Sequence, residues 1–184
     1  MPPMKRLVLK YGLLAGGLMS ALMLGSLSLQ LDLERGMLVG YAGMVAAFLL
    51  VFAAVRAYRD AAPGGTVSFG RALAVGTLVV LVASACYTAA WEAAYFGFYR
   101  DGFLAHYEAA TMRSLQADHA TAAEIEAKRA ELRRFAEWYD NPALNAGATF
   151  LEPLPPGLLM ALAAAGLLRR RRAPEGAAAL AGAG

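Results

Sequence analysis

The sequence ALAVGTLVVLVASACYTAAW, residues 72–91, decides the fold class of this chain. These 20 residues lie between Arg71 and Glu92, and none of them carries a charge. Because a helix rises about 1.5 Å per residue, the stretch matches the hydrocarbon core of a bilayer, which is about 30 Å thick. It therefore predicts a membrane-spanning helix. A cluster typical of a membrane–water boundary lies at its end: Trp91, Tyr95, Phe96, Phe98 and Tyr99.

The composition of the whole chain agrees with this class. The 184 residues are 59% hydrophobic without counting glycine, and 17% are charged. Soluble domains average about 45–50% apolar residues with glycine included and about 25% charged residues. The net charge of +3 comes from basic residues gathered in a few clusters, which argues against a nucleic-acid partner. The single cysteine, Cys86, excludes an intramolecular disulfide.

Three further apolar segments predict three more spans, so we expect one membrane domain over residues 1–172. The expected spans cover about residues 8–31, 36–55, 71–96 and 153–169. A basic start followed by an apolar run is also typical of a signal peptide. The first run is longer than a usual signal core and three more spans follow it, which favours a retained helix. The alanine- and glycine-rich tail, residues 173–184, is expected to be disordered.

The fourth span is the least regular, because three of the four residues after Glu152 are proline. Two arrangements fit this pattern. Either Pro156 lies in the first turn of a short span, or one helix over residues 143–168 is kinked at the prolines. We favour an interfacial segment over residues 143–151, followed by a break and a short span.

Residues 101–140, between the third and fourth spans, have a solvated composition and a helical period. They predict an amphipathic helical insert outside the membrane, and Thr121 and Glu124 match a capping box that begins its second helix. Four crossings place all the basic clusters on one face, which the positive-inside rule makes cytoplasmic. Both termini are then inside and the insert is extracytoplasmic. The topology anchors are Lys5, Arg6, Arg56, Arg59, Arg71, Arg169, Arg170, Arg171 and Arg172.

Small residues recur at every fourth position of the first span and form two strips. The strips are Gly12, Gly16 and Ser20, and Gly17, Ala21 and Gly25. Such strips let the backbones of two helices approach closely within a bilayer. One interpretation is a seam between two copies of the chain, and the other is packing on the protein's own helices. We favour the second, because a bundle of four spans has internal seams to fill.

Two carboxylates call for an explanation, because Glu92 ends the third span and Glu152 begins the fourth. An ionisable group at the membrane edge is costly unless it is paired, hydrated or protonated. One interpretation is a shared cation or proton site. In the other, each carboxylate is an interfacial anchor that is hydrated, paired with Arg100, or capping a helix N-terminus. We favour the anchors, because boundary carboxylates cost less than those at the bilayer centre.

No motif for catalysis, metal binding or cofactor binding is found, so we predict a protein without enzymatic activity. His106 and His119 do not belong to an HExxH or a paired-cysteine pattern. A thiol such as Cys86 in an apolar helix is expected to be unreactive, because low dielectric disfavours the thiolate. The Gly64-Gly65-Thr66 sequence lacks the strand and the lysine of a phosphate-binding loop and predicts a turn.

Several stretches together resemble a bacterial membrane family known as domain of unknown function 4199. These stretches are KRLVLKYGLLAGG, residues 5–17; GGTVSFGRAL, residues 64–73; CYTAAWEAAYF, residues 86–96; and NPALNAGATFLEPLPPGLLMALAAAGLLRR, residues 141–170. The resemblance covers nearly the whole chain. It implies a four-helix inner-membrane protein of bacteria and supplies no activity or catalytic residue.

We therefore predict an all-α membrane protein with four transmembrane helices and both termini in the cytoplasm. Its function is expected to be non-enzymatic and to depend on helix packing and association. The expected partners are the lipid bilayer and either a second copy or another membrane protein of the envelope. The alternative is a small transporter or channel subunit that uses Glu92 and Glu152 near the outer membrane boundary.

Overall fold

The computed structural model describes residues 4–29 and 33–169, and within these ranges every regular element is a helix. In chain order the elements are α1 (Met4–Ser28), α2 (Leu33–Asp60), the short turn η1 (Pro63–Gly65), α3 (Phe69–Ala94), the π-helical turn η2 (Tyr95–Tyr99), α4 (Arg100–Ala117), α5 (Ala122–Tyr139), α6 (Pro142–Leu151) and α7 (Leu154–Leu168).

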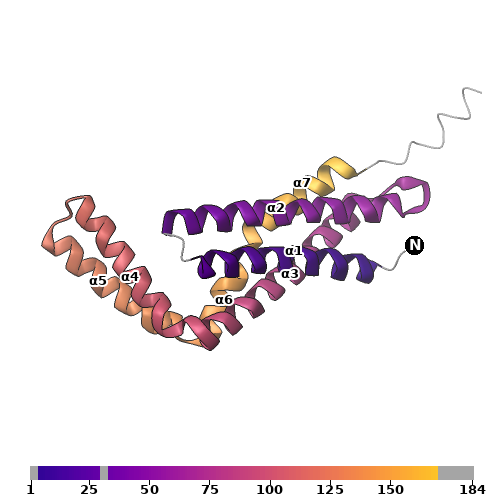
Figure 1. Cartoon of the computed structure of the whole chain (residues 1–184). Coiled ribbons are helices and arrows are strands. Elements are labelled where there is room, and N and C mark those ends of the chain that lie inside the picture. The colour runs from indigo at the N-terminus through magenta and orange to yellow at the C-terminus, as the bar shows by residue number, and fades with distance from the viewer. Residues whose placement is uncertain (1–3, 30–32, 170–184) are drawn as a thin grey trace, which may run out of the picture.

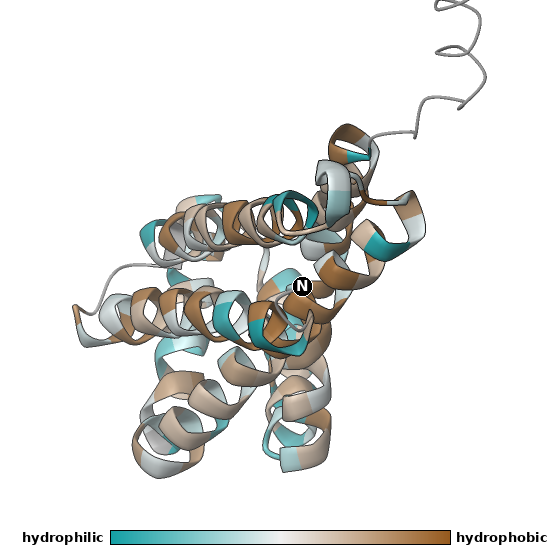
Figure 2. Cartoon of the chain, turned by 90° about the vertical axis from the view of Figure 1, so that its right-hand side faces the viewer, coloured by the Kyte–Doolittle hydropathy of each residue, from teal (hydrophilic) through white to brown (hydrophobic). Residues whose placement is uncertain are grey.

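In the described part of the chain, four segments are long and apolar enough to cross a membrane. They are Met4–Ser28, Arg35–Asp60, Phe69–Tyr99 and Pro142–Leu168. Figure 1 shows α1, α2, α3 and α7 side by side as a bundle, and Figure 2 shows hydrophobic residues recurring along its helices. The prediction of an all-α membrane protein with four spans is therefore confirmed.

Small residues allow the helices of the bundle to cross closely. A Cβ atom added to Gly76 of α3 would lie 2.8 Å from the Cβ atom of Ala161 of α7. One added to Gly157 of α7 would lie 2.6 Å from Val80 and 2.9 Å from Phe48. Because lipid tails are as apolar as the side chains, helices in a bilayer gain from such close contact through dispersion. These glycines set the distance between α7 and its neighbours α2 and α3.

The basic ends of the helices gather at one end of the bundle. Figure 1 shows the start of α1, the loop from α2 to α3 and the end of α7 on the same side, with α4 and α5 at the other. The predicted anchors Lys5, Arg6, Arg56, Arg59, Arg71 and Arg169 belong to these segments, whereas Arg170, Arg171 and Arg172 lie outside the described residues, as does the tail 173–184. The membrane face to which this end belongs stays a prediction.

Two local predictions are confirmed at atomic detail. In the α2–α3 loop, Gly64 and Gly65 have φ angles of 69° and 59°, a left-handed backbone that glycine adopts without steric cost, and they form the expected turn. At the start of α5, the Thr121 backbone N–H donates to the Glu124 carboxylate at 2.7 Å. The Glu124 backbone N–H donates to Thr121 Oγ1 at 3.3 Å, which completes the capping box.

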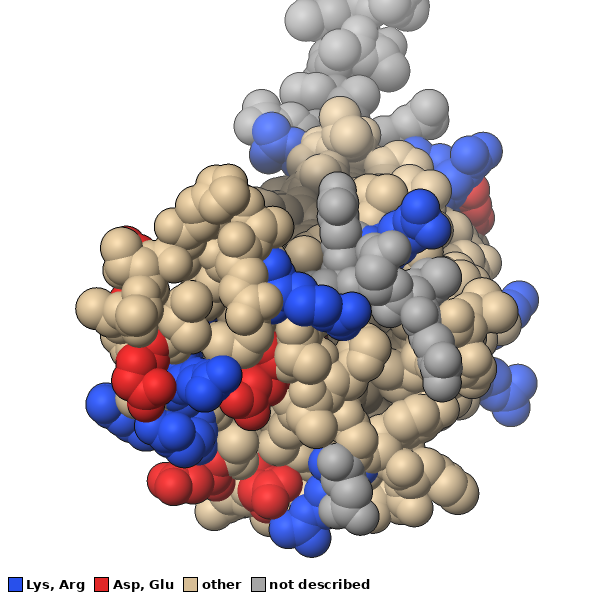
Figure 3. All heavy atoms as spheres, turned by 60° about the vertical axis from the view of Figure 1, so that its left-hand side comes forward, with Lys and Arg blue, Asp and Glu red and all other residues tan. Residues whose placement is uncertain are grey.

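The helix that contains α3 changes direction at the π-helical turn η2 and continues as α4 (Figure 1). A π-helical turn inserts a residue into the helical ladder, and sharp bends commonly occur there. Helices α4 and α5 then form an antiparallel hairpin, called the outer hairpin below. It occupies residues 100–139, where a helical insert over residues 101–140 was expected. Figure 3 brings the hairpin side forward and shows acidic and basic side chains intermingled on it.

The chain returns from the outer hairpin through α6 and α7, which are separated at Glu152 and Pro153. The break therefore lies where the prolines were expected to place it. The structure extends the fourth candidate span back to Pro142, whereas residues 143–151 were expected to form a separate interfacial segment. The reason is that α6 packs along α3 and carries its polar side chains Asn145 and Thr149 into that contact, where both are buried.

Candidate functional site

A cleft of about 650 Å³ lies where the bundle meets the outer hairpin, at the end away from the basic residues. It is lined by the end of α1, the start of α2, the end of α3 with η2, and residues of α4, α5 and α6. Pockets that bind small molecules typically have volumes of about 300–1,000 Å³ and are mostly apolar. The cleft therefore has the size and the position of a ligand site.

The described lining of the cleft is rich in aromatic side chains and contains one carboxylate. The aromatic residues include Tyr87, Trp91, Tyr99, Phe103, Tyr107 and Tyr139. Three methionines, Met23, Met37 and Met44, add flexible apolar surface from α1 and α2. Glu152 supplies the carboxylate, and no lysine or arginine is among these lining residues.

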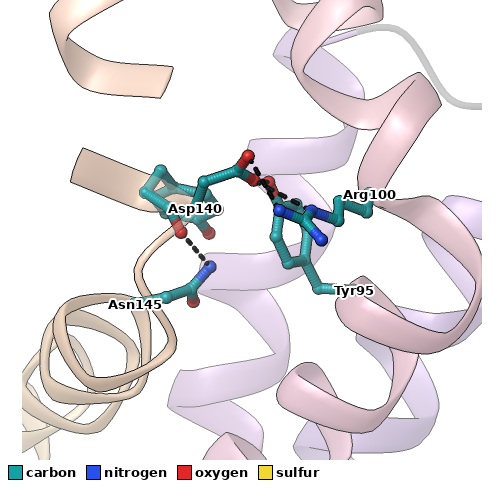
Figure 4. Close-up of polar contacts among 5 residues, drawn as sticks. Tyr95, Arg100, Asp140 and Asn145 are labelled. Carbon is teal, nitrogen blue, oxygen red and sulfur yellow. Dashed lines mark hydrogen bonds and ion pairs between the residues drawn. The ribbon is translucent and has the colours of Figure 1, made fainter. Parts of the chain in front are cut away.

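One wall of the cleft is held by hydrogen bonds to Asn145, whose side chain is fully buried. Trp91 Nε1 donates to Asn145 Oδ1 at 2.9 Å, and Thr149 Oγ1 donates to the same oxygen at 3.3 Å. Asn145 Nδ2 donates to the backbone oxygen of Tyr139 at 3.0 Å, a contact visible in Figure 4. Buried polar groups are costly unless they are paired, so this side chain fixes α3, the end of α5 and α6 relative to one another.

A second polar group closes the base of the outer hairpin. The Tyr95 hydroxyl donates to Asp140 Oδ1 at 3.0 Å, and Arg100 Nη2 donates to Asp140 Oδ2 at 3.2 Å (Figure 4). The hydrogen bond from Arg100, and then that from Tyr95, hold the pKa of the Asp140 carboxyl below its ordinary value. Arg100, considered from sequence as a partner of either Glu92 or Glu152, forms an ion pair with Asp140 that joins the start of α4 to the end of α5.

Aromatic rings fill the space between these two polar groups. The Trp91 and Tyr95 rings stack at a centroid distance of 5.7 Å, and Tyr95 meets Tyr139 edge-on at 5.3 Å. Phe103 packs edge-on against Trp91 at 5.2 Å. Such offset and edge-on pairs are favourable beyond the area they bury. Trp91 and Tyr95 are therefore core residues of the junction rather than members of a lipid-facing belt, whereas Phe98 is 86% exposed.

The two carboxylates singled out from sequence have different surroundings. Glu152 is exposed and lines the cleft together with Tyr87 and Tyr139. It does not cap α7, whose first turn has no side-chain cap. Glu92 is not among the lining residues, and its Oε1 atom is buried without a hydrogen-bond partner in the described chain. Within the described residues, no hydrogen bond joins Glu92 to Glu152.

The model of the family described as protein of unknown function (DUF4199) matches residues 10–170. The chain belongs to the DUF4199 family. The match includes the outer hairpin, the cleft and both carboxylates, so these features lie within the family domain. No curated protein and no solved structure matches the chain.

The two small-residue strips of α1 also lie within the DUF4199 match, and the structure separates them. The strip of Gly12, Gly16 and Ser20 faces α3: a Cβ atom at Gly12 would lie 2.6 Å from Val82, and one at Gly16 would lie 2.6 Å from Cys86. The second strip is open, because nothing lies within 4 Å of a Cβ atom built on Gly17 or Gly25, and Ala21 is exposed. One strip is thus used inside the chain and the other is not.

The histidines and the cysteine of this DUF4199 chain lie apart. His106 lines the cleft, His119 lies in the turn after α4 with a φ angle of 58°, and Cys86 is half-buried on α3. In the described residues, no three His, Cys, Asp or Glu side chains are grouped as metal ligands would be. Sequence reasoning missed Asn145 and Asp140, because an isolated Asn or Asp has no pattern that reveals its partner.

Proposed function

We propose that this protein is a non-enzymatic membrane protein that acts by associating with a second copy of itself through α1. The proposal rests on one observation, the open strip formed by Gly17, Ala21 and Gly25. Small residues spaced by four allow the close helix contacts that drive association in bilayers. A pairing of α1 with α1 would use a face that the protein's own helices leave free.

The side chains around the open strip support this interpretation. Leu14, Leu18 and Leu24 are 51%, 38% and 37% exposed, and they border the small residues on the same helix. A groove of small residues between leucines can accept the leucines of a second helix. The two helices then gain dispersion contacts that are closer than those either helix makes with lipid chains. The other strip of α1 already packs closely against α3, where its glycines meet Val82 and Cys86.

Disulfide crosslinking in native membranes tests the proposal directly. In a Cys86→Ser background, Ala21→Cys is expected to form a disulfide-linked homodimer under mild oxidation. The matched control is Leu167→Cys, which is 76% exposed on α7 and is expected to stay monomeric. Equal crosslinking of the two variants, or none with Ala21→Cys, would contradict association through α1.

Bulky substitutions provide an independent test. Gly17→Ile and Gly25→Ile are expected to convert the dimer to monomer in single-molecule photobleaching, because the added side chains hold the two backbones apart. Gly166→Ile is the control, since this α7 glycine also has nothing within 4 Å. A crosslinked pull-down that recovers a different protein at one copy per chain, and no second copy of this chain, would contradict self-association. The partner of α1 would then be another envelope component.

A transporter or channel subunit is the second candidate, favoured by a polar face on α3. The oxygens Ser84 Oγ, Thr88 Oγ1 and Glu92 Oε1 are buried, spaced by four residues, and have no hydrogen-bond partner in the described chain. Buried polar groups in membrane helices often mark ion or proton pathways. Proton or cation flux into proteoliposomes that is lost with Glu92→Gln and Glu152→Gln would support this candidate. Flux equal to that of protein-free vesicles would reject it.

The cellular setting is part of the proposal. We place the protein in the cytoplasmic membrane of a bacterium, with both termini inside and the outer hairpin outside. The family resemblance and the basic residues at one end of the bundle support this orientation. A reporter enzyme that is active only in the cytoplasm, fused to the C-terminus, is expected to be active. If the reporter is inactive at the C-terminus but active when it is inserted in the outer hairpin, the orientation of the protein is the reverse of the one proposed.

A further inference from the structure

We propose that the cleft between the bundle and the outer hairpin binds an amphiphilic organic cation, whose charged group lies beside Glu152 among aromatic rings. This inference goes beyond self-association and does not depend on it, because the open strip of α1 is a different surface. It rests on three features of the cleft: its aromatic and apolar lining, the unpaired carboxylate of Glu152, and the absence of lysine and arginine from the described lining residues.

The carboxylate of Glu152 has no partner within the described protein. It is exposed to the cleft, and no hydrogen bond or ion pair to it is formed by any described residue. An unpaired carboxylate near a membrane boundary is costly unless water or a cation compensates it. The described lining contains no lysine or arginine, and its one histidine, His106, forms no ion pair with Glu152, so a permanent positive charge beside this carboxylate would come from a bound cation.

The rings near Glu152 favour an organic cation over a hydrated metal ion. Tyr87, Trp91 and Tyr139 line the same cleft as Glu152. The negative faces of aromatic rings attract cations that carry little water, such as substituted ammonium groups. A metal site would need several oxygen, nitrogen or sulfur ligands, and no such group of side chains occurs in the described residues.

The rest of the cleft suits an apolar group attached to that cation. Met23, Met37 and Met44 come from α1 and α2, on the side of the cleft formed by the bundle. Flexible methionines adapt to apolar groups of various shapes. The volume of about 650 Å³ is enough for a molecule of drug-like size rather than for a simple amine. The cleft therefore offers one negative charge, from Glu152, and a large apolar surface from many other residues. A ligand that matches both is an amphiphile with one positive charge.

Two probes of the same shape and opposite charge provide the test. Tetraphenylphosphonium and tetraphenylborate are compared by equilibrium dialysis with the full chain in a neutral detergent. The cation is expected to bind at one site per chain, and the anion is expected to bind at least about tenfold more weakly, because Glu152 attracts one and repels the other. Equal binding of the two probes, or no saturable binding of the cation, would overturn the proposal.

Substitutions locate the site and separate charge from shape. Glu152→Gln is expected to weaken binding of the cation about tenfold. Glu92→Gln, which changes a carboxylate outside the lining, is expected to leave it unchanged. Unaltered affinity in Glu152→Gln, or an equal loss in both variants, would refute a site at Glu152.

A third variant keeps the test valid if Glu152→Gln fails to fold. Gly40 lines the cleft and has nothing within 4 Å of an added Cβ atom, so Gly40→Leu is designed to add an apolar side chain to the lining of the cleft. It is expected to abolish binding of the cation, whereas Gly166→Leu on α7 is not. Full binding by Gly40→Leu would show that the cation binds elsewhere. If both the cation and the anion bind, and Gly40→Leu removes this binding while Glu152→Gln does not, the cleft is a pocket for lipid chains. That result would contradict the cation site.

Discussion

The indole nitrogen of Trp91 donates a hydrogen bond to Asn145 Oδ1 at 2.9 Å, across 54 positions of the sequence. The same asparagine donates to the backbone of Tyr139. One buried amide therefore connects the end of the third span, the end of the outer hairpin and α6. Because Trp91 and Tyr139 both line the cleft, the shape of the cleft depends on this connection.

Replacing the amide is expected to destabilise the protein. Asn145→Ala leaves the Trp91 N–H and the Tyr139 carbonyl without this partner, and each unpaired buried group costs about 1–3 kcal/mol. The free energy of unfolding in mixed micelles is the measurement. Trp91→Phe removes the donor alone, and the double variant is expected to lose less than the sum of the two single losses. Additive losses would show that the two side chains are not coupled.

The ion pair at the base of the outer hairpin is expected to make stability depend on pH. The pKa of Asp140 is lower in the folded protein than in the unfolded chain, chiefly because of Arg100. The pair therefore stabilises the fold fully above the unfolded pKa of about 4 and is lost as the pH falls through the lower folded value. The melting temperature of Asp140→Asn is expected to lie below that of the wild type at pH 7 and to converge with it in acid. A constant difference would contradict this assignment.

Two neighbouring glycines of α1 are expected to respond in opposite directions to the same substitution. A Cβ atom at Gly16 would lie 2.6 Å from Cys86 Cβ and 2.8 Å from the backbone oxygen of Ala83. Gly16→Ala is therefore expected to cost about 1–3 kcal/mol through overpacking. In the monomer, the Cβ atom that Gly17→Ala adds meets nothing within 4 Å, so the substitution is expected to stabilise the monomeric protein by up to about 1 kcal/mol. Equal effects on the melting temperature would refute the difference between the strips.

The turn after α4 contains a residue, His119, whose replacement by glycine is expected to stabilise the protein. His119 has a φ angle of 58°, and the backbone N–H of Ala120 donates to Leu115 O at 2.9 Å around it. Left-handed backbone costs a residue with a Cβ atom about 1–2 kcal/mol. His119→Gly is expected to raise the free energy of unfolding by about 1 kcal/mol. Ala120→Gly, the control, is expected to lower it slightly, and a loss of stability in His119→Gly would contradict the prediction.

Much of the architecture could be predicted because it depends on local sequence. An uncharged run such as residues 72–91 has to be removed from water as a helix, whatever the rest of the chain does. The capping box at Thr121 and the glycine turn at Gly64 are likewise complete within four residues. The candidate site was predicted less well. Glu152 was singled out because it is a carboxylate at the start of the fourth span, but the cleft that it lines was not expected.

The number of apolar helices, their order and the family could all be read from contiguous residues. Three features become visible only in the folded chain: Arg100 pairs with Asp140, Trp91 pairs with Asn145, and one strip of α1 is closed while the other is open. These contacts join distant positions, and they depend on the directions that the chain takes at the π-helical turn and at Pro153. A change of direction at either point moves whole helices, so the identity of a side chain does not reveal its partner.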